Sequence, residues 1–592
     1  MRRILIALLV ALCAMPAAAL DRSALAFTRY DLHATLDPHL HGLAVEGTVV
    51  VRNRSQQPQS EAVLQISSSL HWAAVHVNGQ EVEWLQQTYT TDIDHTGYLT
   101  EAIVKLPQPL PPGESATVAV RYSGVVMKDA TRLTRIGTPD AAALRSDWDE
   151  ISDRFTALRG LGFVTWYPVS MEAASLQHGD ELFETLREWR ERERDAILKI
   201  RVARLPLDED DHTRYLLVLN QDSAKPGAEA EAEYRGEDPV VVMLEDPGVS
   251  DDRPWVNAYY TLDRTNYARD YMTAAEKAIP KLETWFGTPH RKVVLVELTD
   301  PNALPYDAGT YYFAPMRQVA PEGAEVALAR PVAHTMIESP RLWIREGLAG
   351  FAQALVREHQ GGRKAALAYL AQFSSALQVA EAQSQSKPAA SAKDAAKDPA
   401  KQDDAEQAPE GLMSIGPQPL MTTADEVFFR TKAAYVWWML RDRLGDHTLQ
   451  AALSHYRAAE DHDSGYVQRL IEAQLPKGQN MEAFFDDWVY RDKGLPRLKI
   501  ASVNVRKTLG EQTVTAITVE NLGGAACEVP VALRSGNAES TGKVALPAHG
   551  RGILRLSLDS MPLEMDVNDG SVPEAEPRSY RIAITAPEGE KK

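Results

Sequence analysis

Residues 332–349, VAHTMIESPRLWIREGLA, decide how this chain is interpreted, because they combine a helical pattern with side chains that can carry chemistry. They lie in a region, residues 331–377, that the sequence predicts to be helical. Within it, His334 and Glu338 are four residues apart. On an α-helix this spacing puts both side chains on one face, where they could bind a single metal ion.

Each of these residues also has an ordinary structural interpretation. A lone histidine on a helix is often a hydrogen-bonded packing residue. Glu338 could form a surface ion pair with Arg341 or Arg345. Glu346, near the start of the next helix, could complement the helix dipole. The stretch therefore leaves metal binding and structural roles open.

Most of the chain before this stretch has strand character. Residues 27–126 alternate apolar and polar side chains in short runs, and Asn78-Gly79 supplies typical turn chemistry. Strand patterns return up to about residue 244, so residues 20–248 are predicted to form an antiparallel β-sandwich. Helical periodicity then begins, with a helix closed by Gly287.

The rest of the chain divides by composition. Residues 381–411 contain no aromatic residue and no Leu, Ile or Val, so they predict a disordered insertion. It separates a mostly helical region, residues 249–380, from its remainder, residues 412–494. Alternating runs in residues 495–592 predict a second β-sandwich.

The first 19 residues have the pattern of an export signal. Arg2 and Arg3 precede an apolar run, which ends at the small residues Ala17, Ala18 and Ala19. We expect a mature protein in the periplasm or outside the cell, without stable membrane insertion. Its single remaining cysteine, Cys527, allows no internal disulfide.

The charge of the chain limits its partners. A formal net charge of −19 disfavours nucleic acid and anionic membranes, which both attract clustered Lys and Arg. A cationic peptide would be compatible with this charge. The acidic surface is also compatible with a role in solubility alone.

Six separated motifs, in this order, resemble those of the M1 family of zinc aminopeptidases, which are gluzincins. They are VHVNG (75–79), PGE (112–114), WYP (166–168), LETWFG (282–287), LWIREGLA (342–349) and FFDDWVY (484–490). The resemblance spans much of the chain and implies a multidomain α+β fold. Its expected parts are an N-terminal β-sandwich, a thermolysin-like, mostly helical catalytic-type domain and a C-terminal β-sandwich.

The resemblance also implies a zinc site, but the HExxH motif is altered. His334 matches the first ligand, Glu338 replaces the second histidine, and Glu346 matches the third ligand. Thr335 stands at the position of the general base, and a hydroxyl cannot take a proton from zinc-bound water as a carboxylate can. A His334, Glu338 and Glu346 set could still hold zinc, manganese or iron.

Two further parts of the family machinery are also altered. The loop that binds the substrate amine corresponds to residues 307–312, where Asp307, Gly309 and Tyr311 are the candidate residues. Asp307 is also typical of turn chemistry before a glycine. The family's transition-state tyrosine aligns with Arg430, a residue that could stabilise an oxyanion. Tyr435 is about 140° further round that helix and is a poor replacement.

These observations predict an exported relative of the family that is catalytically inactive and binds a peptide or protein in the former active-site cleft. Loss of a general base alone costs about 10²- to 10⁴-fold in rate. The alternative is an active metallo-aminopeptidase with a His334, Glu338 and Glu346 metal site. A structural member of an envelope assembly is the third hypothesis.

Overall fold

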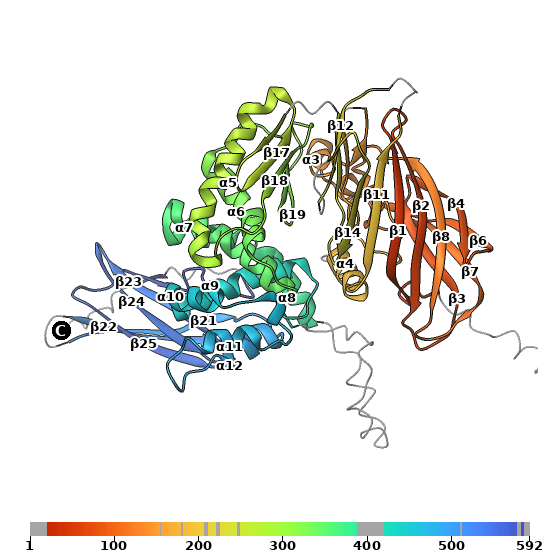
Figure 1. Ribbon diagram of the computed structural model, residues 1–592. Helices are drawn as coiled ribbons and strands as arrows, with labels where there is room; N and C mark the ends of the chain where they lie inside the picture. Colours follow the sequence, from red (N-terminus) through yellow and green to blue (C-terminus); the bar gives the residue numbers. More distant parts are fainter. Residues whose placement is uncertain are drawn as a thin grey trace, which may run out of the picture.

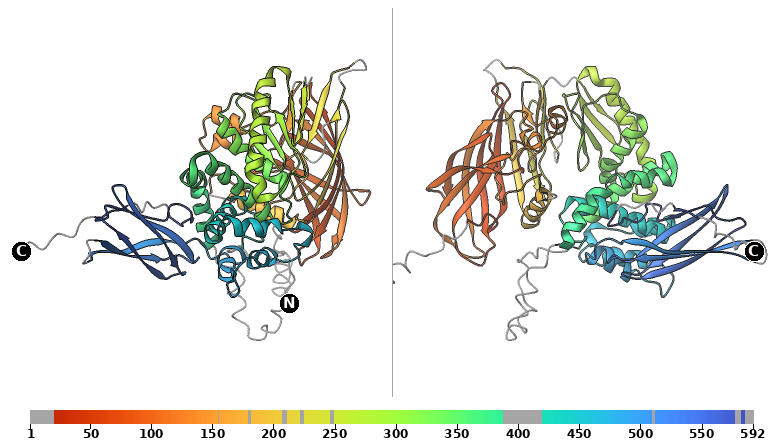
Figure 2. Two further views of the ribbon diagram at one scale, coloured as in Figure 1. Left: turned by 60° about the vertical axis from the view of Figure 1, so that its left-hand side comes forward. Right: turned by 180° about the vertical axis from the view of Figure 1, so that it is seen from behind.

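The computed structural model describes residues 20–153, 155–178, 181–206, 211–220, 225–245, 249–386, 419–508, 512–576 and 582–584. The predicted export signal, residues 1–19, lies outside these ranges. The chain is a multidomain mixture of β-sheets and helices (Figure 1). The N-terminal and C-terminal sheets lie on different sides of a central helical region, as the view from behind shows (Figure 2).

The N-terminal region is built on two facing sheets that share one apolar core. In spatial order, the larger consists of β14 (Ala230–Arg235), β11 (Ile197–Arg204), β1 (Leu25–Asp37), β2 (Gly42–Asn53), β8 (Ser115–Val125), β4 (Leu70–Val77) and β5 (Gln80–Glu81). The smaller consists of β3 (Gln59–Ser67), β7 (Tyr98–Leu110) and β6 (Trp84–Thr90). The region departs from the predicted antiparallel sandwich in two ways: β1 and β11 pair in parallel, and the described part of residues 20–248 also contains a third sheet and three helices. A long connection between β1 and β11 permits their parallel pairing.

A further sheet joins the N-terminal region to the rest of the molecule. It consists of β13 (Lys225–Pro226), β12 (Tyr215–Leu219), β15 (Val241–Glu245), β10 (Phe155–Leu158) and β9 (Glu150–Ile151). Along the chain, α2 (Thr131–Arg135) and α3 (Asp140–Ser146) precede β9, and α4 (Glu181–Arg192) follows β10. Val218 and Val242 of this sheet share an apolar cluster with Val296 and Phe313 of the next region. This shared core fixes one wall of the cavity described below.

The following region combines a five-stranded sheet with long helices. Its strands are β16 (Val249–Asp252), β17 (Val256–Tyr260), β18 (Val293–Glu297), β20 (Tyr311–Ala314) and β19 (Tyr306–Ala308). The 3₁₀ turn η1 (Leu262–Arg264) precedes helices α5 (Thr265–Phe286), α6 (Pro321–Met336) and α7 (Leu342–Ala371). As predicted, α5 ends at Gly287, whose positive φ suits a glycine. None of the helices in the described ranges has the length and apolar character needed to cross a bilayer.

Short helices complete the central region. They are α8 (Ser374–Ser386), the π-helical turn η5 (Val427–Lys432), α9 (Ala433–Leu444), α10 (Asp446–Ser454), η6 (Ala458–Glu460), α11 (Tyr466–Glu472), α12 (Glu482–Phe485) and η7 (Asp486–Tyr490). Residues 381–386 of the predicted insertion are helical, because α8 continues through them and Glu381 forms a buried ion pair with Lys432. Residues 387–411 lie outside the described ranges.

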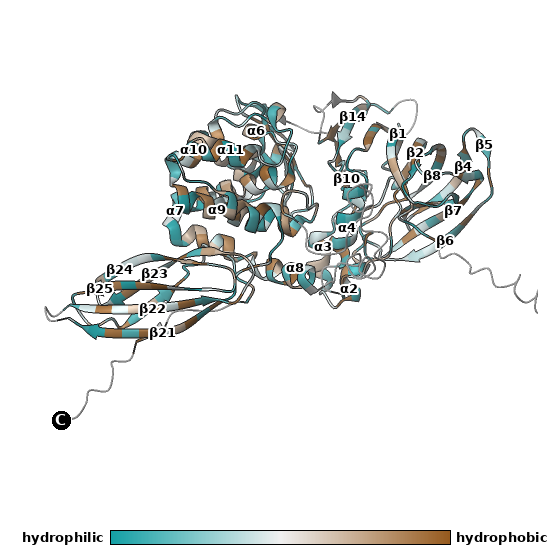
Figure 3. Cartoon of the chain, turned by 90° about the horizontal axis from the view of Figure 1, so that it is seen from below, coloured by the Kyte–Doolittle hydropathy of each residue, from teal (hydrophilic) through white to brown (hydrophobic). Residues whose placement is uncertain are grey.

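The C-terminal region is a sandwich of two sheets. One contains β21 (Leu498–Lys507), β22 (Thr513–Asn521) and β25 (Arg551–Leu558). The other contains β24 (Ala538–Leu546), β23 (Cys527–Ser535), β26 (Glu564–Val567) and β27 (Ile582–Ala583). Hydrophobic and hydrophilic residues alternate along these strands (Figure 3), as a sandwich with one buried face per sheet requires. Trp488 donates a hydrogen bond to Ala526 at 2.9 Å and anchors the sandwich to the helices.

Candidate functional site

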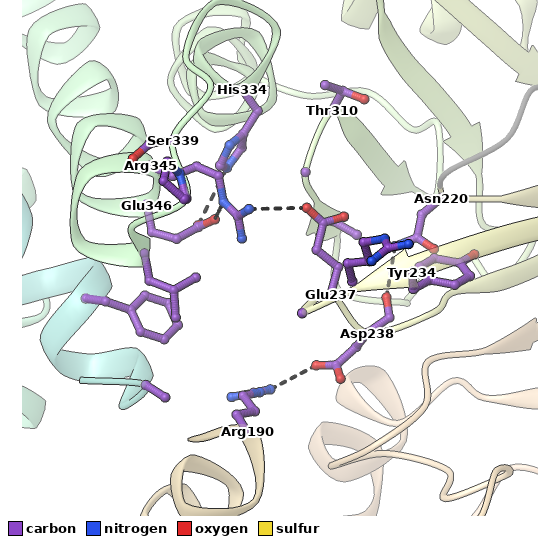
Figure 4. A pocket seen from close by; sticks show the side chains of 18 of the residues that line it. Arg190, Asn220, Tyr234, Glu237, Asp238, Thr310, His334, Ser339, Arg345 and Glu346 are labelled. Carbon is purple, nitrogen blue, oxygen red and sulfur yellow. Dashed lines mark hydrogen bonds and ion pairs between the residues drawn. The ribbon is translucent and has the colours of Figure 1, made fainter. Parts of the chain in front are cut away.

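A cavity of about 1180 Å³ lies between the N-terminal region and the helices. We call it the interdomain cavity. Its lining includes Arg190, Glu237 and Asp238 from the N-terminal side, and His334 and Glu346 from the other side (Figure 4). Asp307 and Arg430 also belong to the lining. Lys and Arg side chains are as numerous as Asp and Glu side chains in the lining. The acidic charge of the whole chain therefore does not extend to this cavity.

The carboxylate of Glu346 is the centre of a charged cluster in the cavity wall. Arg330 forms an ion pair with its Oε2 atom, and Arg345 Nε donates to its Oε1 atom at 3.3 Å. His334 Nε2 lies 3.5 Å and Arg430 Nε 3.8 Å from Oε2. Burial alone would raise the pKa of Glu346, but His334 and the nearby arginines hold it well below its usual range. Glu346 is therefore an ionised carboxylate enclosed by cations.

The connection between α6 and α7 produces this cluster. Helix α6 ends at Met336, and Ile337 has extended backbone angles. After only five residues the chain enters α7, and the two helices pack against each other. His334 lies in the last turn of α6 and Glu346 in the second turn of α7, so the tight connection brings their side chains together.

Glu338 does not join His334 and Glu346. The sequence prediction placed Glu338 one helical turn after His334, but the helix ends two residues before Glu338. The side chain of Glu338 is 56% exposed and pairs with Arg291 at 3.0 Å. A surface ion pair was the alternative interpretation of this residue, although Arg291 rather than Arg341 or Arg345 is its partner.

Thr335, at the position of the general base, is buried beside His334. Its hydroxyl donates a hydrogen bond to the carbonyl of Val332 at 2.6 Å, inside its own helix. Its own carbonyl accepts a hydrogen bond from the backbone N–H of His290 at 2.8 Å. The contacts of Thr335 are therefore structural, because its hydroxyl bonds to the backbone of its own helix.

The residues of this cluster do not fit a zinc ion. A zinc site with a reactive water needs three protein ligands at about 2.0–2.2 Å from the metal. Of the three candidate ligands, only His334 and Glu346 are close together, and Glu346 is already paired with the Arg330 guanidinium. Within the described part of the chain, no group of three or more His, Cys, Asp or Glu side chains could hold a metal ion.

The predicted amine-binding loop is the turn between β19 and β20. Gly309 has φ of +59°, a backbone conformation that favours glycine. Tyr311 is buried in β20. Asp307 forms an ion pair with Arg330 Nε at 2.9 Å. Its carboxylate therefore has a partner outside the turn, in addition to any role in the turn itself. The loop thus supplies a second carboxylate for Arg330 in the same cluster.

Arg430 lines the interdomain cavity from the π-helical turn η5. Its Nη1 atom pairs with Glu426 at 2.7 Å, one helical turn earlier. Tyr435 is buried in α9, and Trp437 stacks on Trp343 with ring centroids 5.2 Å apart. The aromatic residues after Arg430 therefore form core, whereas Glu426 and Arg430 present charged groups to the cavity.

Sequence reasoning did not identify several members of this site. Arg330 lies one helical turn before His334, so the four-residue spacing could have indicated that they share a face. No signal in the sequence indicated Glu237, which follows β14 and pairs with Arg345 Nη1 at 3.3 Å across the cavity (Figure 4). Nor did any signal indicate the pair of Arg190 with Asp238 at 3.0 Å.

Gly347 sets how closely α7 approaches α9 beside the site. A Cβ atom at this position would lie 2.5 Å from Ala433 Cβ and 3.1 Å from the Trp437 ring. We expect Gly347→Ala to destabilise the protein by about 1–3 kcal/mol, because the core must shift to accept a methyl group. Thermal unfolding measures this effect.

Gly323 provides the matched control, because a Cβ atom there would meet no atom within 4 Å. Gly323→Ala in helix α6 should be neutral or stabilising by up to about 1 kcal/mol. Equal effects of the two substitutions would contradict the close approach of α7 and α9.

Neither a family model nor a curated protein sequence matches this chain. Among solved structures, it is similar to an M1 zinc metallopeptidase from Deinococcus radiodurans, with 18% identity and a TM-score of 0.39. The similarity covers 79% of this chain and 94% of that one. A variant of that metallopeptidase bound to a Tyr-Ser-Ala substrate gives 17% identity, a TM-score of 0.40 and the same coverage. Likenesses of this size identify neither the reaction nor the ligands of this chain.

Proposed function

We propose that this chain is an exported protein with an M1-aminopeptidase-like architecture that binds a peptide or protein segment in the interdomain cavity without hydrolysing it. The observation that carries the proposal is the charged cluster around Glu346. Where the family resemblance implies a metal ligand, this carboxylate is paired with Arg330 and approached by Arg345 and Arg430.

Two features of the site support binding without hydrolysis. The position beside His334 carries Thr335, whose hydroxyl is bound to its own helix and cannot serve as a carboxylate base. Arg330 already supplies positive charge to Glu346, so a divalent cation there would meet electrostatic repulsion from three guanidinium groups. The cavity itself is large enough for several amino-acid residues.

The alternative of an active enzyme with a His334, Glu338 and Glu346 metal site receives less support. It requires Glu338 to turn inward from an exposed position and to leave Arg291. It also requires Arg330 to release Glu346, although both side chains are almost fully buried. No observation favours these rearrangements.

Metal analysis and a hydrolysis assay on the purified protein test the proposal. We expect less than stoichiometric zinc, manganese or iron, and no release of N-terminal residues from a mixture of unmodified peptides. Fluorescence polarisation should detect binding of labelled peptides from the same mixture. One bound metal ion per chain, together with peptide hydrolysis that His334→Ala abolishes, would overturn the proposal. Absence of any peptide binding would overturn it as well.

A further inference from the structure

We propose that Arg345 and Arg430 form a carboxylate-binding subsite in the interdomain cavity. The ligand group is a carboxylate, either from an Asp or Glu side chain or from a peptide C-terminus. This inference rests on the proposed binding function and specifies the chemistry of its ligand. It also differs from what the net charge of the chain indicates, since that charge is compatible with a cationic peptide.

The two arginines have donors available beyond their present contacts. A guanidinium group carries five N–H donors in a fixed planar arrangement. In the described part of the chain, Arg345 donates hydrogen bonds only from Nε, to Glu346, and from Nη1, to Glu237. The side chain of Arg430 is 36% exposed, and its contacts with described residues are an ion pair of Nη1 with Glu426 and a longer one of Nε with Glu346. Both side chains line the cavity, so a bound ligand can reach them.

The acidic groups beside them are already engaged, so they are less able to bind an amine. Both oxygens of Glu346 are approached by cations, Oε2 by Arg330 and Oε1 by Arg345. Asp307 pairs with Arg330, and Glu426 pairs with Arg430 at 2.7 Å. An incoming ammonium group would have to displace these buried or short contacts, whereas a carboxylate can use donors that are not saturated.

Glu237 shows how a carboxylate can occupy the subsite. It comes from the N-terminal side of the cavity and reaches Arg345 on the opposite side (Figure 4). Its 3.3 Å contact is longer than the 2.7–2.9 Å typical of charge-assisted hydrogen bonds, so a better placed carboxylate can replace it. Arg345 and Arg430 both approach the same residue, Glu346, so one ligand carboxylate can contact both guanidinium groups.

Fluorescence polarisation with labelled pentapeptide mixtures tests the subsite on the full mature chain. The randomised positions exclude Asp and Glu, and three mixtures are compared. The first has a central Glu and an amidated C-terminus, the second a central Gln and a free C-terminus, and the third a central Gln and an amidated C-terminus. We expect the first or the second mixture to bind about 10- to 100-fold more tightly than the third, the range for hydrogen bonds to charged groups. The mixture that binds more tightly identifies the source of the carboxylate.

Variants at the subsite separate this inference from general peptide binding. Arg430→Gln and Arg345→Gln should each remove most of the preference for the carboxylate mixture, while Glu237→Gln should strengthen its binding. Arg497→Gln, an exposed ion-pair residue of the C-terminal sandwich, is the matched control and should change nothing. A melting curve confirms that each variant is folded.

The outcomes are distinguishable. Equal binding of all three mixtures would overturn the carboxylate subsite and leave the proposed function standing. A fourth mixture, with a central Lys and an amidated C-terminus, is added to the comparison, and its tighter binding than the two carboxylate mixtures would likewise overturn the subsite. If no mixture binds at all, the proposed function itself fails. If Arg430→Gln does not fold, the other two variants still test the subsite. Arg345→Gln should weaken binding of the carboxylate mixture, and Glu237→Gln should strengthen it.

Discussion

Replacing Glu346 with alanine is expected to lower the free energy of unfolding by about 3–5 kcal/mol. The side chain is 10% exposed and is the shared partner of Arg330, Arg345 and Arg430. Its removal leaves Arg330, itself buried, with Asp307 as its one counter-ion among the described residues. Urea unfolding followed by circular dichroism measures the loss.

Glu338→Ala is the matched control for this prediction. Glu338 is 56% exposed and has a surface ion pair with Arg291, so its removal should cost at most about 1 kcal/mol. If Glu346 and Glu338 instead shared a metal ion, each substitution would weaken metal binding and would lower the stability to a similar extent. Equal losses for the two variants, together with a loss of bound metal in both, would contradict the cluster described here.

Lys432→Met is expected to have a destabilising effect of similar size, about 3–5 kcal/mol at pH 8. Lys432 lies buried between Glu381 of α8 and Asp492 after η7, and it pairs with Asp492 at 3.1 Å. Its removal takes the shared ammonium group away from two buried carboxylates. The loss should shrink towards pH 5, because Glu381, whose pKa burial raises to about 7, is then protonated and no longer needs the ammonium group. Urea unfolding at a series of pH values measures this trend.

In the unmodified protein, the ion-pair cluster of Lys432, Glu381 and Asp492 makes the free energy of unfolding depend on pH in one direction. Burial raises the pKa of Glu381 to about 7, although Lys432 opposes this shift. The folded pKa is thus above the value of about 4.3 for an unfolded glutamate. The contribution of Glu381 to stability is fully present below pH 4.3 and is lost as the pH rises through about 7. Glu381→Gln, the control variant, should remove this dependence between those values. An unchanged pH profile in Glu381→Gln would contradict the assignment.

The spacing of apolar residues in the sequence predicted the strands and helices that bury one face in the core. The alternation in β22 and the apolar spacing in α5 appear in the structure as alternating burial and as a buried helical stripe. The parallel pairing of β1 with β11 could not be predicted in this way, because alternation gives the face of a strand but not its neighbour. The helical continuation of α8 through residues 381–386 was also missed. There the buried ion pair of Glu381 with Lys432 and the hydrogen bond from Ser384 to Asp492 connect these residues to the neighbouring helices.

The role of the candidate site residues stays a prediction, but the structure shows where their side chains lie. His334 and Glu346 do lie together, and Arg430 does line the same cavity. Glu338 was placed wrongly, because a regular helix was assumed beyond Met336. Arg330 and Glu237 belong to no motif, and the motif that contains Arg345 did not indicate its contact with Glu237, since these contacts join distant segments.

The amino-acid sequence alone settles which chemical groups are available: Thr335 has a hydroxyl where a carboxylate base would be needed, and no folding can change that. It also indicates the type of the strongly periodic elements, because burial of one face imposes a period on each of them. That Glu346 meets three guanidinium groups rather than a set of metal ligands follows from the three-dimensional fold. Helix ends and long-range ion pairs depend on packing between elements, and the turn after Met336 directs Glu338 to solvent while Arg330 reaches Glu346.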